Sequence, residues 1–336
     1  MSDIKISFVV IAYNAENDIE RCLQSIINQT LDKKEIIVVD DGSTDRTLLL
    51  AEQMKKNYNQ MMIIHQKNTG ILGARKRGVD NANGKYIFFV DSDDYLAEDI
   101  GMRLLAYTDK KGVDIVVSGY YLCNGIEIIN KNMHFEEIKG NEYLKRILCQ
   151  QVVHSAWGKL IKRELLSNSE FMKLPNITMG EDLLINVCLG VCQPLVYVTS
   201  ECGYFYNSLK GDDSKANSRR ILEIIHTMEY IEHILKHHDV YQVNEEAFEF
   251  SYCANIFLYY VAGSARTDYK IKKELFTVWQ KKKINISKNP YYLVYVENLK
   301  ITERFVLKLY EKRFFWLPYC GVRMLVKIHD RLCPKE

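Results

Sequence analysis

The segment "KYIFFVDSDD", residues 85–94, decides the fold of the first half of this 336-residue chain. Four apolar residues, 87–90, run directly into the carboxylates Asp91, Asp93 and Asp94. A short, uninterrupted apolar run predicts a strand that is buried on both faces. "ISFVVIAY" at 6–13 and "EIIVVDDGS" at 35–43 have the same character. Strands of this type predict a mainly parallel sheet that is covered on both sides.

Helical patterns separate these strands. The segments 15–29, 44–58 and 71–82 each place apolar residues at helical spacing. The alternation predicts an α/β fold with a Rossmann-like, mixed but mainly parallel sheet. In such sheets ligands bind at the carboxyl ends of the strands. The polar residues that follow the strands should therefore meet at one edge: Asn14, Asp40, Asp41 and Asp91.

The chain is predicted to have three parts. Residues 1–100 carry the regular alternation, 101–214 are mixed α and β, and 215–336 form a helical C-terminal region. The polar segment "SLKGDDSKANSRR", residues 208–220, predicts the loop at the last boundary.

Composition excludes several classes of protein. A net charge of +2 argues against binding of nucleic acid by bulk charge. The nine cysteines include no C-x-x-C pair, which argues against a zinc ribbon and is typical of free thiols in a reducing cytosol. The N-terminus lacks the pattern of a secretory signal, and no apolar run reaches about 18 residues. A cytoplasmic protein is expected.

Three motifs suggest chemistry, and each has a simpler structural alternative. In the D-x-D run at 91–93, alternate side chains point to one side, which suits Mg²⁺ or Mn²⁺, although Ser and Asp also cap helices. A carboxylate of "VDDGSTDRT", residues 39–47, could accept from a ribose or a base, or could belong to a turn. "KNTGILGARKRG", residues 67–78, suits a diphosphate, or is a capped amphipathic helix.

The order of the motifs resembles the family 2 inverting glycosyltransferases with the A-type nucleotide-sugar fold, of the bacterial surface-polysaccharide type. The resemblance covers 4–207 and is strongest over 4–100; its motifs are "AYN", "VDDGSTD", "NTGILGAR", "FFVDSDD", "WGKL" and "MGEDLL". It implies a nucleotide-sugar-binding half at 1–100, an acceptor-binding half at 101–214, a UDP-sugar donor, a glycan or lipid-linked glycan acceptor, and Mn²⁺ or Mg²⁺ as cofactor.

The resemblance places the donor at the carboxyl edge of the sheet. Asp41 would accept a hydrogen bond from the uracil ring, with Asp40 in support. Asp93 would be the principal metal ligand, and Asp91 would contact the ribose or the metal. Ala12, Tyr13 and Asn14 would flank the base. Arg75 would lie near the nucleotide or diphosphate, in a loop that Asn68 and Gly70 shape. Ser92 would belong to the same site, and Asp94 would hold the sugar or a metal-bound water.

The acceptor side is implied by "MGEDLLIN", residues 179–186. Asp182 would be the catalytic base, with Glu181 as runner-up or support, although both also suit the first turn of a helix. Trp157 would pack beneath a sugar and Lys159 would meet a phosphate or the acceptor; a core Trp with a surface Lys is the alternative. The chain departs from the family pattern at Lys76, where relatives often have Asn, and at Asn207, where many have Arg.

The C-terminal tail is basic and amphipathic. Residues 300–331 contain eight Lys or Arg and three acids. This composition fits peripheral contact with an anionic membrane surface, which would place the protein on the inner face of the plasma membrane. Docking on the catalytic domain or a homodimer contact remains the open alternative.

Two other functions compete with glycosyl transfer. A nucleotidyltransferase should carry a glycine- and basic-rich triphosphate loop, which "VVIAYNAENDI" lacks. A catalytically idle relative that acts as a binding partner would be favoured by loss of Asp93 or Asp182, and both are present.

Overall fold

The computed structural model describes residues 4–109, 112–125, 127–131, 136–208, 222–263, 268–301, 304–305 and 307–308. The chain forms two compact units. The first comprises Met1–Ile147 with Val153–Lys210, and the second comprises Leu148–Val152 with Gly211–Glu336. The predicted boundary after residue 214 falls within 209–221, outside the described residues.

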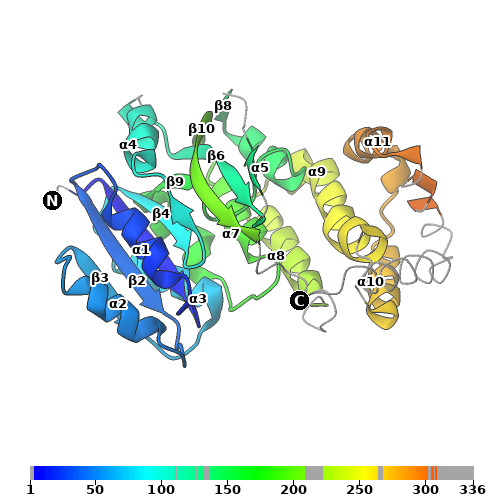
Figure 1. The fold of residues 1–336 in the computed structure, drawn as a ribbon. Helices are drawn as coiled ribbons and strands as arrows, with labels where there is room; N and C mark the ends of the chain where they lie inside the picture. Colours follow the sequence, from blue (N-terminus) through cyan, green and yellow to red (C-terminus); the bar gives the residue numbers. More distant parts are fainter. Residues whose placement is uncertain are drawn as a thin grey trace. The chain divides into compact units, whose positions relative to one another are not determined.

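The first unit is built on a mixed sheet, as predicted. Its described strands run in the order β3-β2-β1-β4-β9-β6-β10-β5, with β7 beside β6 and β8 beside β10. The strands β1 to β4 form the parallel part (Figure 1), β10 is parallel to β6, and β9 runs antiparallel between β4 and β6. The strand bounds are Ile6–Ala12 (β1), Lys34–Asp40 (β2), Met61–His65 (β3), Tyr86–Asp91 (β4), Tyr95–Leu96 (β5), Ile115–Cys123 (β6), Ile128–Lys131 (β7), Glu136–Lys139 (β8), Lys159–Lys162 (β9) and Leu195–Asn207 (β10).

The register of the parallel strands brings their carboxyl ends together. Ala12 pairs with Asp40, and Asp40 pairs with His65 on the next strand. On the other side of β1, Ile11 pairs with Asp91. The apolar residues of β1, β2 and β4 are buried, as continuous apolar runs predict. The polar residues that follow them therefore share one edge of a rigid sheet.

The helix bounds of this unit are Ile19–Ile27 (α1), Thr47–Lys55 (α2), Gly70–Asp80 (α3), Ile100–Leu105 (α4), Asn141–Leu148 (α5), Arg163–Asn168 (α6) and Glu181–Gly190 (α7). The first three helices of this unit lie at the predicted helical segments 15–29, 44–58 and 71–82, whereas α4 and α6 were not predicted. Helix α1 buries Ile19, Leu23 and Ile26 along one stripe, whereas Ile27 is half-buried.

Two elements differ from the sequence expectation. The sequence "PLVYVTSECGYFYN", residues 194–207, is typical of a strand pair or of a strand and a turn, but residues 195–207 form one strand of 13 residues. Its register to β6 shifts on either side of Cys202, so bulges replace the expected turn. Strand β9, which was not expected, begins in the "WGKL" segment and extends two residues beyond it.

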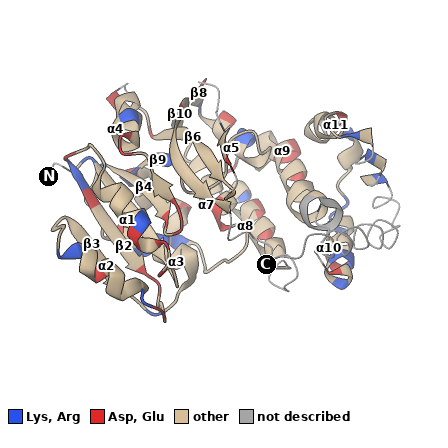
Figure 2. Cartoon of the chain, viewed as in Figure 1, with Lys and Arg blue, Asp and Glu red and all other residues tan. Residues whose placement is uncertain are grey.

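The second unit is helical in its described residues. It contains Glu223–His237 (α8), Tyr241–Cys253 (α9), a π-helix at Ala254–Gly263, Tyr269–Lys281 (α10) and Pro290–Glu297 (α11). Lys and Arg residues lie along α10 (blue in Figure 2). Among the described residues, no helix is both long and apolar enough to cross a membrane. Most of the basic tail, 300–331, lies outside the described residues.

Candidate active site

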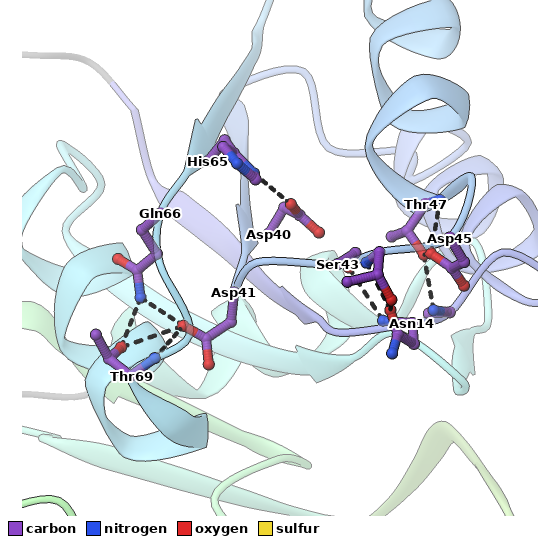
Figure 3. A network of polar contacts seen from close by, with 11 residues as sticks. Asn14, Asp40, Asp41, Ser43, Asp45, Thr47, His65, Gln66 and Thr69 are labelled. Atoms are coloured by element: carbon purple, nitrogen blue, oxygen red, sulfur yellow. Dashed lines mark hydrogen bonds and ion pairs between the residues drawn. The ribbon is translucent and has the colours of Figure 1, made fainter.

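The loops after β1 and β2 are joined by side-chain hydrogen bonds. Asn14 adopts a left-handed conformation, φ 50°, which Asn tolerates better than most residues. Its Oδ1 accepts from the backbone N–H of Thr44 at 2.9 Å, and its own N–H donates to Ser43 Oγ at 3.0 Å (Figure 3). Tyr13, beside it, is 52% exposed. The loop is thus fixed by the protein itself and presents an aromatic ring at the sheet edge.

Asp41 is a buried carboxylate that organises the start of α3. It accepts hydrogen bonds from the backbone N–H groups of Thr69 and Gly70, each at 2.8 Å (the Thr69 bond is drawn in Figure 3). The side-chain amide of Gln66 donates to it at 2.8 Å as well. The first N–H groups of a helix have no partner within the helix, so Asp41 caps α3 from a distance. Its oxygens are largely used by the chain.

The Asp40 carboxylate has fewer hydrogen-bond partners than that of Asp41. Its side chain is buried, and its Oδ2 lies 2.6 Å from Nδ1 of His65 (Figure 3). Its Oδ1 is also buried, and nothing in the described part of the chain donates to it. A buried carboxylate oxygen without a donor costs free energy. This oxygen is therefore a place where an N–H group of a ligand would be stabilising.

The loop before α3 also packs tightly against its neighbours. A Cβ on Gly42, which has φ 77°, would lie 2.9 Å from the backbone nitrogen of Asn68. Asn68 Oδ1 accepts from the N–H of Gly70 at 3.2 Å. The backbone oxygen of Ala12 accepts from the N–H of Asp41 at 2.9 Å. Ala12, Asn68 and Gly70 therefore help to set the path of the backbone at the sheet edge.

Asp94 joins the end of β4 to β10. It is fully buried; Tyr204 donates its hydroxyl to Oδ2 at 2.6 Å, and the N–H of Asn207 donates to Oδ1 at 2.8 Å. The same Tyr204 oxygen accepts from the N–H of Asp91 at 3.2 Å. Burial, and then the charge of Asp91, raise the pKa of Asp94 to about 8. Both oxygens of Asp94 thus serve the fold, and Asn207 contributes its backbone.

Asp93 differs from Asp94 in this respect. Its backbone oxygen accepts from Arg21 at 2.7 Å, and that guanidinium lies 5.1 Å from the ring centre of Tyr95. Its carboxylate is half-buried, and no group in the described ranges donates to it. Ser92, between the two carboxylates of the D-x-D run, is buried. The Asp93 carboxylate is free to take an external ligand.

Arg75 connects the end of β4 to the start of α7. Its side chain is 1% exposed; Nη1 donates to Asp182 Oδ1 at 2.6 Å and Nη2 donates to Asp91 Oδ1 at 3.2 Å. The side chains of Asp91 and Asp182 are 25% and 28% exposed. Burial raises the pKa of Asp91 to about 6; Arg75 opposes this, and Asp182 and Asp93 add to it. Two residues from distant motifs, 91 and 182, thus lie on either side of one cation.

Buried polar contacts hold the first turn of α7 in place. Gly180 precedes the helix with φ 75°, and Glu181 and Asp182 form its acidic first turn. Asn186 is buried and donates to the backbone oxygens of Asp182 and His154, each at 2.8 Å. Its Oδ1 accepts from the hydroxyl of Tyr143 at 2.8 Å. This network fixes the backbone that carries Asp182.

Trp157 and Lys159 point into the unit. The Trp157 ring stacks on Tyr204 and Tyr206 with centroid distances of 4.5 and 5.2 Å and is 8% exposed. Lys159 is completely buried rather than on the surface, and its Nζ donates to the backbone oxygens of Val153 and Ser155. Burial lowers the pKa of Lys159 to about 7. Both side chains support the residues around the site.

The D-x-D run offers carboxylate oxygens that could hold a divalent cation. Asp93 has an uncommitted carboxylate, and Asp91 has a second oxygen besides the one that meets Arg75. Within the described residues, the carboxylates of Asp91, Asp93 and Asp182 do not converge on a single point. Hard cations such as Mg²⁺ often bind through one or two carboxylates plus phosphate and water. The donor set fits that mode, with Asp94 excluded by its own hydrogen bonds.

Several residues at this edge carry no motif that sequence reasoning could use. Tyr204 lies within an aromatic run at a strand end, and Asn186 sits one turn after Asp182, but neither position predicts its contacts. His154 lies near Asp182; burial lowers its pKa and the charge of Asp182 partly opposes this. Arg21 lies on α1, and nothing in the sequence of that helix predicts its hydrogen bond to the backbone oxygen of Asp93.

Comparison with known proteins gives a consistent result. Residues 7–168 match the model of the family described as Glycosyl transferase family 2. Glycosyltransferase GlyA from Streptococcus pneumoniae is 32% identical over 228 residues, which cover 63% of this chain and 32% of GlyA. Poly(ribitol-phosphate) beta-glucosyltransferase from Bacillus spizizenii is 33% identical over 207 residues, 60% of this chain and 32% of that protein. The chain spans between 32% and 55% of the length of the first curated relatives it matches.

Solved structures show the same fold. S. aureus TarS 1-349 in complex with UDP-GlcNAc superposes with a TM-score of 0.57 at 19% sequence identity, covering 92% of each chain. At this level of identity the likeness concerns the fold alone, and it agrees with the predicted A-type architecture.

Proposed function

Residues 7–168 place this chain in glycosyl transferase family 2, and on that premise we propose that it transfers a sugar from a UDP-sugar to a glycan acceptor with inversion. The carrying observation is the link at the sheet edge, where Arg75 joins Asp91 of the D-x-D run to Asp182 of α7. The link brings the proposed donor and acceptor motifs, which are far apart in sequence, to one place.

The proposed donor site lies over the ends of β1, β2 and β4. The exposed ring of Tyr13 provides a surface on which a base can stack. Because Asp41 is occupied by the start of α3, we assign the contact with the base N–H to Asp40, whose Oδ1 has no donor in the described chain. That oxygen is covered, so this contact requires a small shift of the loops above it. TarS, which shares the fold, was solved with UDP-GlcNAc, and this supports a nucleotide-sugar donor.

The proposed base is Asp182. Its Oδ1 is held by Arg75, which leaves Oδ2 for the acceptor hydroxyl. The carboxylate takes the hydroxyl proton while the acceptor oxygen bonds to the anomeric carbon and the bond to the diphosphate breaks. A single displacement of this kind inverts the anomeric centre. Glu181, in the same first turn of α7, adds a second negative charge beside Asp182.

Asp93, with Asp91 as its partner, is the proposed holder of Mn²⁺ or Mg²⁺. Such an ion would offset the charge that develops on the departing diphosphate. The chain's own contribution is to leave the Asp93 carboxylate and one Asp91 oxygen uncommitted while Tyr204 and Asn207 keep Asp94 in the fold.

Release of UDP tests the proposal directly. The purified chain is incubated with a panel of UDP-sugars, with Mn²⁺ or with EDTA, and UDP is measured. Sugar-dependent UDP release that EDTA abolishes supports the proposal. Absence of turnover with every sugar nucleotide, despite UDP binding, would favour the alternative of a catalytically idle partner.

The relatives and the basic tail support the proposed acceptor and location. A relative is named as a poly(ribitol-phosphate) glucosyltransferase, which supports a role in surface polysaccharide synthesis. A lipid-linked glycan acceptor would suit peripheral contact of 300–331 with the inner face of the plasma membrane, the location that we propose. Sedimentation with anionic vesicles, compared between the full chain and a chain ending at residue 299, tests that contact.

A further inference from the structure

Arg75 is a fully buried cation with two partners that come from different parts of the chain. Asp91 is 16 residues away in sequence and Asp182 is 107 residues away. The guanidinium also lies 5.9 Å from the ring centre of Phe89. Its Nε is buried, and nothing in the described part of the chain accepts from it. The position of Arg75 is therefore set mainly by the two carboxylates.

The neighbouring carboxylates keep the buried Arg75 side chain protonated. Burial acts to lower the pKa of Arg75, but Asp182 and Asp91 more than offset it, so the pKa lies above its ordinary value. A buried cation is tolerated when it is paired. The two carboxylates, in contrast, are each about a quarter exposed and can accept further partners. Arg75 is thus the fixed member of the group, and each carboxylate keeps one oxygen for other contacts.

This geometry does not suit direct binding of a diphosphate by Arg75. A phosphate-binding arginine must present its N–H groups to the ligand. Here Nη1 and Nη2 point at Asp182 and Asp91, and 1% of the side chain is exposed. Arg77, two residues later on the same helix, is exposed and offers a comparison within the chain.

We infer that Arg75 is a positioning residue, which holds the base Asp182 beside the donor motif and competes with a divalent cation for Asp91. The inference rests on the proposed function for the role of Asp182, but not for the competition at Asp91. Removing the guanidinium has opposite effects on the two partners. Asp91 gains affinity for a divalent cation because it loses a competing positive charge. Asp182 loses its orientation, and transfer slows.

The test compares Arg75→Met and Arg75→Lys with the control Arg77→Met. Binding of Mn²⁺ alone is measured by electron paramagnetic resonance, UDP binding in Mn²⁺ by calorimetry, and transfer by UDP release. For Arg75→Met we expect Mn²⁺ affinity to rise about threefold or more, UDP affinity to stay within about threefold, and kcat to fall about 100-fold. Arg75→Lys, which keeps the charge, should retain more activity than Arg75→Met, and Arg77→Met should match the wild type.

The outcomes separate three roles of Arg75. A parallel loss of UDP affinity and transfer would show that Arg75 binds phosphate and would overturn the inference. Weaker Mn²⁺ binding together with a lower melting temperature would show a merely structural role and would overturn it too. If Arg75→Met does not fold, the same measurements on Arg75→Lys decide, since one ammonium group cannot reach both carboxylates equally. If the wild type transfers no sugar, the proposed function fails, while the Mn²⁺ titration still decides the competition at Asp91.

Discussion

The two halves of the sheet edge hold their carboxylates in opposite ways. At the end of β2, Asp41 receives hydrogen bonds from Gln66, Thr69 and Gly70, so its charge is stabilised by the chain itself. Near the end of β4, Asp91 and Asp182 share Arg75, and the Asp93 carboxylate receives no donor from the described residues. The fold thus satisfies Asp41, whereas it leaves the Asp93 carboxylate, and Oδ1 of Asp40, for an external partner. We propose that the β2 region shapes the donor site and that the β4 region carries the chemistry.

The strongest test of the comparison is removal of the proposed base, Asp182. Asp182→Asn keeps the size of the side chain and its contact with Arg75, but it cannot take a proton. We expect transfer to fall by a factor of about 10² to 10⁴, the range typical of a general base. UDP affinity, measured by calorimetry, should remain close to that of the wild type.

The matched control is Glu181→Gln, one position earlier on the same turn. It should lower transfer far less than Asp182→Asn. If Glu181→Gln were the more damaging of the two, the base would have to be reassigned to Glu181. Loss of UDP binding in Asp182→Asn would place that residue on the donor side instead.

The D-x-D run offers the next largest contrast, because its neighbouring acids have different surroundings. Asp93→Asn removes an uncommitted carboxylate, so Mn²⁺ affinity should fall about tenfold or more, with little change in stability. Asp94→Asn disturbs the contacts with Tyr204 and Asn207, so it should lower stability and leave Mn²⁺ affinity nearly unchanged. Titration with Mn²⁺ and thermal unfolding separate the two. Equal effects of both substitutions on Mn²⁺ affinity would contradict the assignment of Asp93, and not Asp94, as the metal ligand.

The sequence predicts the framework of this edge but not its internal contacts. Continuous apolar strands fix the parallel part of the sheet, so the placement of Asp40 and Asp91 at strand ends follows from the pattern. The role of Asp94 could not be foreseen, because its partner Tyr204 lies 110 residues away on β10. Strand β9 was missed because "KLIK" is short and mixes charged with apolar residues. The contacts of Asp94 and the pairing of β9 depend on residues that are distant in sequence, and local periodicity does not predict such contacts.

A smaller effect is expected on the β2 side. Asp41→Ala leaves the first N–H groups of α3 without their acceptor, so the free energy of unfolding should fall by about 2 kcal/mol. UDP affinity should fall as well, because the loop at 66–70 loses its anchor, whereas the affinity for Mn²⁺ alone should not change. Urea denaturation and calorimetry provide the measurements. A loss of Mn²⁺ affinity equal to that in Asp93→Asn would show that the two regions do not act separately.

The last contrast concerns the support behind the proposed acceptor side, where Lys159 is buried and its Nζ donates to the backbone oxygens of Val153 and Ser155. Its pKa in the folded chain is about 7, below the ordinary value of 10.5, and burial is the main cause. Between these values the unfolded chain binds more protons than the folded one, so the free energy of unfolding should rise with pH, by at most about 1.4 kcal/mol per pH unit. Lys159→Met should remove this rise between pH 7 and 9.5.

The matched control for this pH experiment is Lys162→Met, because that lysine is half-exposed on the same strand. Urea denaturation at several pH values gives the slopes, and the difference between each variant and the wild type cancels the titration of other groups. A slope that persists in Lys159→Met would mean that the lysine is protonated over the whole range. Its hydrogen bonds to Val153 and Ser155 would then outweigh its burial, and the acceptor side would hold a stable buried cation as the donor side does with Arg75.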